Sequence, residues 1–144
     1  MFDTAGLVVG AVEAVELVTI GQRRGVGLPG GGPKRYVVDV DAGPEPHVVV
    51  GEERELDDER LEVRQLVWAD DPLRGPTPVL VQCSAHGEPR RAVFDGGTTI
   101  VWDEPQRRVA PGQSVVLYDT SNTWVHGGGV AARSSTFDSA FNRR

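Results

Sequence analysis

The fold of this chain follows from one stretch near its start, which reads Thr19-Ile20-Gly21-Gln22-Arg23-Arg24-Gly25-Val26-Gly27-Leu28-Pro29-Gly30-Gly31-Gly32. The apolar residues leading into it, Val15 to Ile20, predict a strand, and Tyr36 to Val40 after it predict another. The stretch itself holds six of the chain's 18 glycines. Glycine at this density lets a backbone take positive φ values and approach a partner closely. We therefore expect a glycine-rich loop between two strands.

The loop is also basic, because it contains Gln22, Arg23, Arg24 and Gly25 and is followed by the pair Lys34-Arg35. Arginine forks onto carboxylate or phosphate oxygens, and glutamine and backbone amides add hydrogen bonds to a phosphate chain. These residue types predict a contact surface for an anionic polymer. The alternative is a long hairpin loop with solvated arginines, and the residues by themselves leave both interpretations open.

The rest of the chain predicts an all-β fold. A length of 144 residues suits one ordinary domain or two very small ones, and 18 glycines with 10 prolines indicate many turns. Short, regular apolar runs predict two small tandem antiparallel β-barrels with Gly/Pro-rich turns. The expected domains are residues 1–68, containing the glycine and arginine loop, and 69–132, followed by a loose tail over 133–144.

Several local expectations are definite enough to test. Residues 11–20 are predicted to be a strand because of their β-branched content, and residues 36–40 and 47–51 are predicted to form a hairpin. One helical turn is expected over 57–61, capped by Asp57. The remaining strands are predicted at residues 7–9, 63–68, 78–84, 90–94, 98–102, 114–118 and 124–131.

The net charge of −6 argues against a generic nucleic-acid binder, which is usually basic. Its distribution is informative, because twelve of the 21 acidic residues lie between Asp39 and Asp71. Ten of the 15 basic residues come as adjacent pairs, which permits a local positive face on an acidic molecule. The pairs are Arg23-Arg24, Lys34-Arg35, Arg90-Arg91, Arg107-Arg108 and Arg143-Arg144.

Several classes of protein are disfavoured. No apolar run approaches the roughly 18 residues of a membrane span, and the N-terminus lacks the order of a signal peptide, so we predict a cytoplasmic protein without membrane contact. Gly25 to Gly30 fits the letters G-x-G-x-x-G, but the residues that follow are not helical. We therefore predict no nucleotide cofactor.

The sequence gives little support to a catalytic or metal site. Cys83 and His86 lie three apart, but Cys83 sits in an apolar strand, where an inert thiol is the commoner finding. A single cysteine excludes an internal disulfide. His47, His86 and His126 lack second ligands at useful spacing, and Ser114 lacks a G-x-S-x-G frame. We predict neither catalytic nor metal-ligating residues.

Several longer blocks of the sequence resemble a known protein family. Val18 to Gly27, Tyr36 to Asp39 and Val49 to Gly51 are similar to the central domain of bacterial tRNA-specific 2-thiouridylases. In the second half, Gln82 to Gly87, Arg108 to Asp119, and Gly127-Gly128-Gly129-Val130 resemble that family's C-terminal β-barrel. The chain is thus identified as similar to that family's last two domains, from about Asp3 to Ala131.

The resemblance implies a role in tRNA processing. Members of that family activate the wobble uridine of tRNA with ATP and insert sulfur, using an ATP-binding domain and two reactive cysteines upstream of the region matched here. Because those parts have no match in this chain, the resemblance implies a non-catalytic tRNA-binding module, and Cys83 is not one of the reactive pair. The resemblance also implies that Gln22, Arg23 and Arg24 contact RNA, and less directly that Lys34 and Arg35 do.

Three alternatives remain open at this stage. The module could work with a separate ATP-binding thiouridylase chain, serve instead as a protein-interaction module that meets an acidic partner, or be a truncated remnant that does not bind RNA. One departure bears on this choice, because the chain has Gly10-Ala11-Val12-Glu13-Ala14 where the family usually shows a G-x-H-x-G turn.

Overall fold

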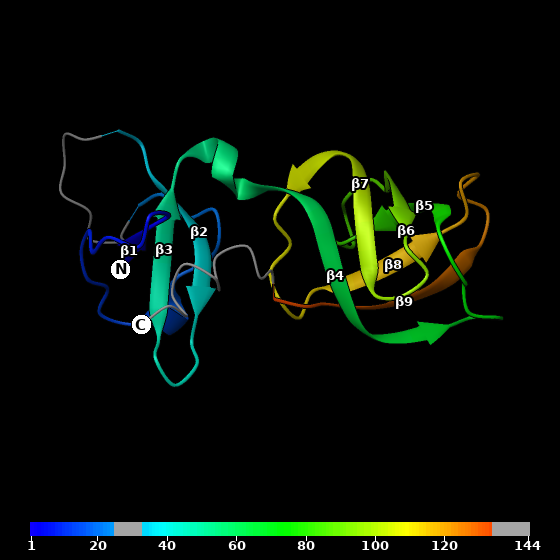
Figure 1. Ribbon diagram of the computed structural model, residues 1–144, viewed down its shortest axis with the longest axis horizontal. Coiled ribbons are helices and arrows are strands. Elements are labelled where there is room, and N and C mark those ends of the chain that lie inside the picture. Colours follow the sequence, from blue (N-terminus) through cyan, green and yellow to red (C-terminus); the bar gives the residue numbers. More distant parts are fainter. Residues whose placement is uncertain (25–32, 134–144) are drawn as a thin grey trace. The chain divides into compact units, whose positions relative to one another are not determined.

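The computed structural model describes residues 1–24 and 33–133. They form two compact units, one containing Met1–Asp57 and the other beginning at Asp58. The first holds β1 (Phe2–Asp3), β2 (Tyr36–Asp41), β3 (His47–Gly51) and the 3₁₀ turns η1 (Val15–Leu17) and η2 (Glu53–Leu56). The second holds β4 (Asp57–Trp68), β5 (Thr77–Gln82), β6 (Arg90–Phe94), β7 (Thr99–Arg107), β8 (Ser114–Tyr118) and β9 (Val125–Ala131). The described residues contain no α-helix, which confirms the all-β prediction (Figure 1).

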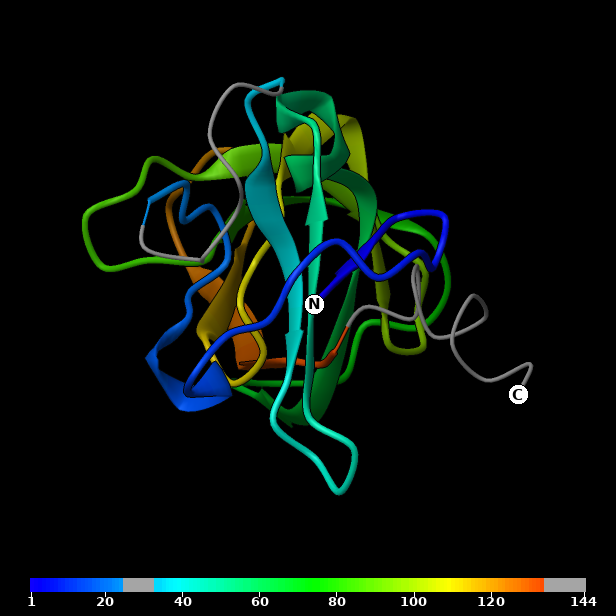
Figure 2. The ribbon, with the colours of Figure 1, turned by 90° about the vertical axis from the view of Figure 1, so that its left-hand side faces the viewer.

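A three-stranded sheet in the order β1-β3-β2 is the centre of the first unit. β2 and β3 pair antiparallel from Tyr36↔Gly51 to Asp41↔His47, so the predicted hairpin is confirmed, and Figure 2 shows its two strands running into one turn. β1 lies on the other side of β3 and is parallel to it. The described residues therefore form an open mixed sheet here, not the closed barrel predicted for the first half.

The predicted strand over residues 11–20 is wrong, because this segment carries η1 and no strand. Val12, Val15 and Val18 recur every third residue and pack against a buried cluster of valines from the sheet. A regular strand would instead place alternate residues on one face. Tertiary packing has thus overridden the β-branched composition. The buried valines are Val37, Val48 and Val50.

The second unit is a closed barrel in the order β4-β7-β6-β5-β8-β9. Buried residues alternate with less buried ones along β5, β6 and β8, as expected for a barrel wall. Phe94, Ile100 and Leu117 are fully buried at its centre, and no described residue of the first unit belongs to this core. The prediction of a small antiparallel barrel is confirmed for this half.

The boundary region differs from expectation in two ways. The helical turn predicted over residues 57–61 is wrong, since the turn is η2 at Glu53–Leu56 and Asp57 begins β4. A capping box explains the shift, because the side chains of Glu52 and Glu55 satisfy each other's backbone amides. Residues 63–68, expected to close the first domain, instead pair with β9 in the barrel. The predicted tail beyond Arg133 lies outside the described residues.

Candidate nucleic-acid interface

Gln22 stands where the glycine-rich loop leaves the first unit's sheet. The backbone amide of Gly21 donates to the carbonyl oxygen of Val37 at 2.8 Å, and the amide of Val37 donates to that of Gln22 at 2.9 Å. The side-chain Nε2 of Gln22 donates to the carbonyl oxygen of Arg24 at 2.9 Å, while its Oε1 accepts from the amide of Thr19 at 3.1 Å. The Gln22 side chain therefore shapes the local turn and is already occupied.

Arg23 and Arg24 follow this anchored residue and are exposed. Within residues 1–24 and 33–133 neither guanidinium forms an ion pair. Their charges are thus available to an external anion at a point fixed by the pairing of residues 21–22 with Val37. Gly25, also predicted to contact RNA, lies outside the described residues.

Lys34 and Arg35 enter β2 from the other side of the loop. Both line a small hollow of about 120 Å³ in the first unit. Three carboxylates, those of Asp3, Glu52 and Glu55, line it too. The surroundings of Lys34 and Arg35 are therefore of mixed charge, and the three carboxylates repel an approaching anion.

The three tryptophans do not form a stacking surface. Trp102 is buried in the barrel core, and Trp68 packs edge-on against Phe94 at 5.5 Å between ring centroids. Trp124 is 65% exposed, but it lies over a hollow shared with Asp70 and Asp71, whose charge repels nucleic acid. Base stacking on Trp124 therefore receives no support from its surroundings.

The Cys83–His86 pair lacks the features of a catalytic thiol. Burial raises the pKa of the Cys83 thiol to about 11, whereas nucleophilic cysteines have a lowered pKa. The cavity beside Cys83 is not lined by His86. No group of three or more His, Cys, Asp or Glu side chains in the described part of the chain is arranged to hold a metal ion.

Other basic residues converge where sequence reasoning did not place a site. Arg90, Arg107 and Arg108 line one cavity in the second unit, although they belong to two different basic pairs. For Arg90 the sequence does contain an indication. Side chains alternate between the two faces of a strand, and Arg90 falls on the same face of β6 as the buried residues Ala92 and Phe94. The meeting of β6 with the end of β7 is a tertiary feature and is invisible in the sequence.

These features together define an all-β protein built on a closed six-stranded antiparallel barrel with a small accessory sheet unit. The chain belongs to the family of the aminomethyltransferase beta-barrel domain, whose model matches residues 58–131. That range corresponds to the barrel, from its first strand to its last. No helix among the described residues has the length and apolar character needed to cross a membrane.

Relatives extend the similarity to both units and confirm the resemblance to the 2-thiouridylases. The tRNA-specific 2-thiouridylase MnmA of Chloroflexus aggregans is 40% identical over 136 residues, which cover 91% of this chain and 37% of the relative. That of Thermobifida fusca is 39% identical over 122 residues, covering 81% of this chain and 33% of the relative. The bifunctional protein NifU/MnmA of Rubrobacter xylanophilus is 40% identical over 134 residues, which cover 91% of this chain and 26% of the relative. The chain thus spans about a third of the length of these relatives.

Proposed function

We propose that this chain is a non-catalytic tRNA-binding module that serves 2-thiolation of the wobble uridine. The observation that carries the proposal is the exposed pair Arg23-Arg24, free of ion pairs with described residues and held beside β2 by the backbone pairing of residues 21–22 with Val37. The names of the relatives, which are tRNA-specific 2-thiouridylases, supply the substrate class.

Catalysis belongs, in this proposal, to a region of the relatives that the chain does not span, acting as a separate ATP-binding polypeptide. The local chemistry supports a division of labour, because burial raises the pKa of the single cysteine, Cys83. The contribution of this chain is then positional: it adds phosphate contacts that hold tRNA, without taking part in bond making.

The test is binding of fluorescently labelled tRNA by anisotropy across a salt series. Each phosphate contact releases counterions, so the slope of log affinity against log salt reports the number of contacts. We expect the Arg23→Ala/Arg24→Ala variant to bind more weakly and to reduce the slope by roughly 1.5 to 2. Arg60→Ala/Arg64→Ala is the matched control, because it removes the same charge from exposed positions on β4.

The control separates a local contact from a general charge effect. Equal loss with both double variants would mean that only net charge matters, and would overturn the assignment of Arg23 and Arg24. Absence of tRNA binding by the unmodified chain at low salt would overturn the RNA proposal and favour a protein-interaction module, which the net charge of −6 also accommodates.

A further inference from the structure

The outer side of the barrel carries an apolar face across three strands, β4, β9 and β8, which are neighbours in the wall (Figure 1). In β8, Val116 stands between two buried residues and therefore points outward. In β4, Val67 stands between Leu66 and Trp68, which pack against the core, so it also points outward and is 72% exposed. The four residues of this apolar face are Val67, Val116, Trp124 and Val125.

The centre of the apolar face has no side chain. Gly128 on β9 pairs with Val67 on one side and with Val116 on the other. The two valines therefore stand on either side of bare backbone, and an open hollow of about 440 Å³ lies between them. Val125 lines the same hollow. Because glycine presents no Cβ, an apolar side chain from outside can reach the floor of this hollow.

Trp124 adds a large aromatic ring next to Val125, and it is 65% exposed. It lies in the turn before β9, so the preference of strands for aromatic residues does not account for it. The turn holds it in place, because its backbone amide donates to Oδ1 of Asp119 at 2.7 Å and its carbonyl oxygen accepts from the amide of Asp119 at 3.1 Å. Rigid, exposed tryptophans are typical anchors of protein interfaces.

A negative charge borders the apolar face. Trp124 and Val125 also line a second hollow, of about 370 Å³, together with His126 and the pair Asp70-Asp71. Both aspartates are exposed, and neither forms a hydrogen bond or an ion pair with any residue in the ranges 1–24 and 33–133. A contiguous group of exposed apolar residues with a polar rim marks an interaction site, whereas single exposed apolar residues do not.

The charge and shape of this surface select a protein as its partner. Asp70 and Asp71 repel nucleic acid and anionic lipid, and open hollows cannot enclose a small molecule. A second copy in two-fold symmetry would bring this acidic surface against itself. Because β9 is paired on both sides, the face has no free strand edge there, so the partner binds through side chains. Lysine and arginine complement the aspartates.

We propose that the apolar face is a docking surface for a protein segment that combines apolar and basic side chains. Apolar side chains of the partner occupy the hollow over Gly128 and contact Trp124, and a lysine or arginine lies beside Asp70 and Asp71. The surface belongs entirely to the second unit, and the inference does not depend on tRNA binding by the first unit.

The test is selection of a phage-displayed library of random twelve-residue peptides on the immobilised full chain. Peptides that also bind the Val67→Ser/Trp124→Ser variant are removed in each round. Both positions are exposed, so this variant is expected to keep its fold. We expect the enriched peptides to contain large apolar residues and to carry net positive charge. A synthetic peptide of an enriched sequence is expected to bind the variant about tenfold or more weakly.

The contribution of charge is measured with the same synthetic peptide. Asp70→Asn/Asp71→Asn is expected to weaken binding about three- to tenfold, the effect of two exposed ion pairs, and to make it less sensitive to salt. Asp103→Asn/Glu104→Gln is the matched control, because it removes the same charge from adjacent exposed positions on β7. It is expected to change the affinity less than twofold.

Four results would overturn the docking surface. Two come from the peptides: no enrichment once binders of the Val67→Ser/Trp124→Ser variant are removed, or equal weakening by the two charge variants. The others assign the face to another occupant: labelled decauridylate that loses affinity for the Val67→Ser/Trp124→Ser variant, or a dimer in sedimentation that this variant abolishes. None of these measurements uses the Arg23→Ala/Arg24→Ala variant, so the tRNA proposal is tested separately.

Discussion

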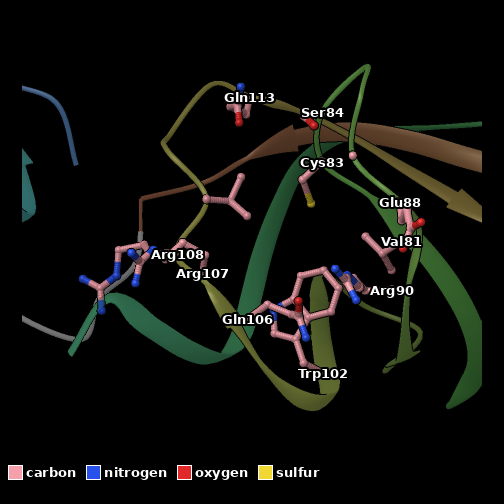
Figure 3. A pocket seen from close by; sticks show the side chains of 12 residues that line it. Val81, Cys83, Ser84, Glu88, Arg90, Trp102, Gln106, Arg107, Arg108 and Gln113 are labelled. Carbon is pink, nitrogen blue, oxygen red and sulfur yellow. The ribbon is translucent and has the colours of Figure 1, made fainter. Parts of the chain in front are cut away.

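At the scale of single residues, burial decides what Cys83 can do. Its thiol lines the barrel mouth and points into it (Figure 3), yet the partly apolar surroundings raise its pKa from 9.0 to about 11. Desolvation disfavours the thiolate, which is the form that attacks electrophiles. The position of a cysteine in a pocket is therefore not sufficient evidence of a nucleophile.

The expected consequence is slow alkylation of the native protein. At pH 8 about one Cys83 thiol in a thousand is ionised, which is about 100-fold fewer than for a cysteine of pKa 9.0. We predict that iodoacetamide labels native protein about 100-fold more slowly than unfolded protein, as measured by mass spectrometry. The chain has one cysteine, so the signal is unambiguous, and equal rates in both states would restore the Cys83–His86 hypothesis.

The raised pKa of Cys83 also makes the stability of the folded state depend on pH. The folded pKa lies above the unfolded value, so the folded state favours the neutral thiol. This contribution is fully present below pH 9 and is lost as the pH rises toward 11.

At the scale of elements, the glycine run of β9 is a packing requirement of the barrel. A Cβ on Gly129 would lie 2.5 Å from the carbonyl oxygen of Arg64 on β4, and one on Gly128 would lie 2.6 Å from that of Val115 on β8. A Cβ on Gly127 would meet the carbonyl oxygen of Val67. Since these contacts are with backbone atoms of the neighbouring strands, a side chain cannot be accommodated by a change of rotamer.

Gly129→Ala is accordingly expected to destabilise the barrel by about 1–3 kcal/mol, the usual cost of overpacking. The measurement is urea unfolding followed by tryptophan fluorescence. Gly97→Ala is the control, because a Cβ there first meets another atom at 3.4 Å and the position is exposed. A change within about 0.5 kcal/mol is expected for it, and equal effects of the two variants would contradict the packing explanation.

At the scale of the whole molecule, the described residues form separate apolar cores. One core consists of barrel residues including Phe94 and Ile100, and two smaller clusters belong to the first unit, around Val48 and Val49. Because the cores share no residue, we propose that the two units unfold in separate steps.

Phe94→Ala is predicted to cost the barrel about 3–5 kcal/mol and to leave the first unit protected. Hydrogen exchange with mass spectrometry measures both units in one sample. Peptides from β5 to β8 should exchange faster in this variant, while peptides from β2 and β3 keep their protection. Val49→Ala is the reciprocal variant, and simultaneous loss of protection in both units with either substitution would show that they unfold as one.

Sequence by itself determined the all-β class, the hairpin of residues 36–41 and 47–51, and most of the barrel wall, because alternation of apolar residues and turn-forming Gly and Pro are local signals. It missed the first half of β4 and the second half of β7. It also determined the family, through blocks such as residues 82–87 and 108–119. Only the tertiary structure decided which strands close a barrel, why residues 11–20 are not a strand, and that Arg90 and Arg107 line the same cavity. These outcomes depend on pairing between distant segments, and the free energy of that pairing comes from burial and register, which no short window of sequence contains.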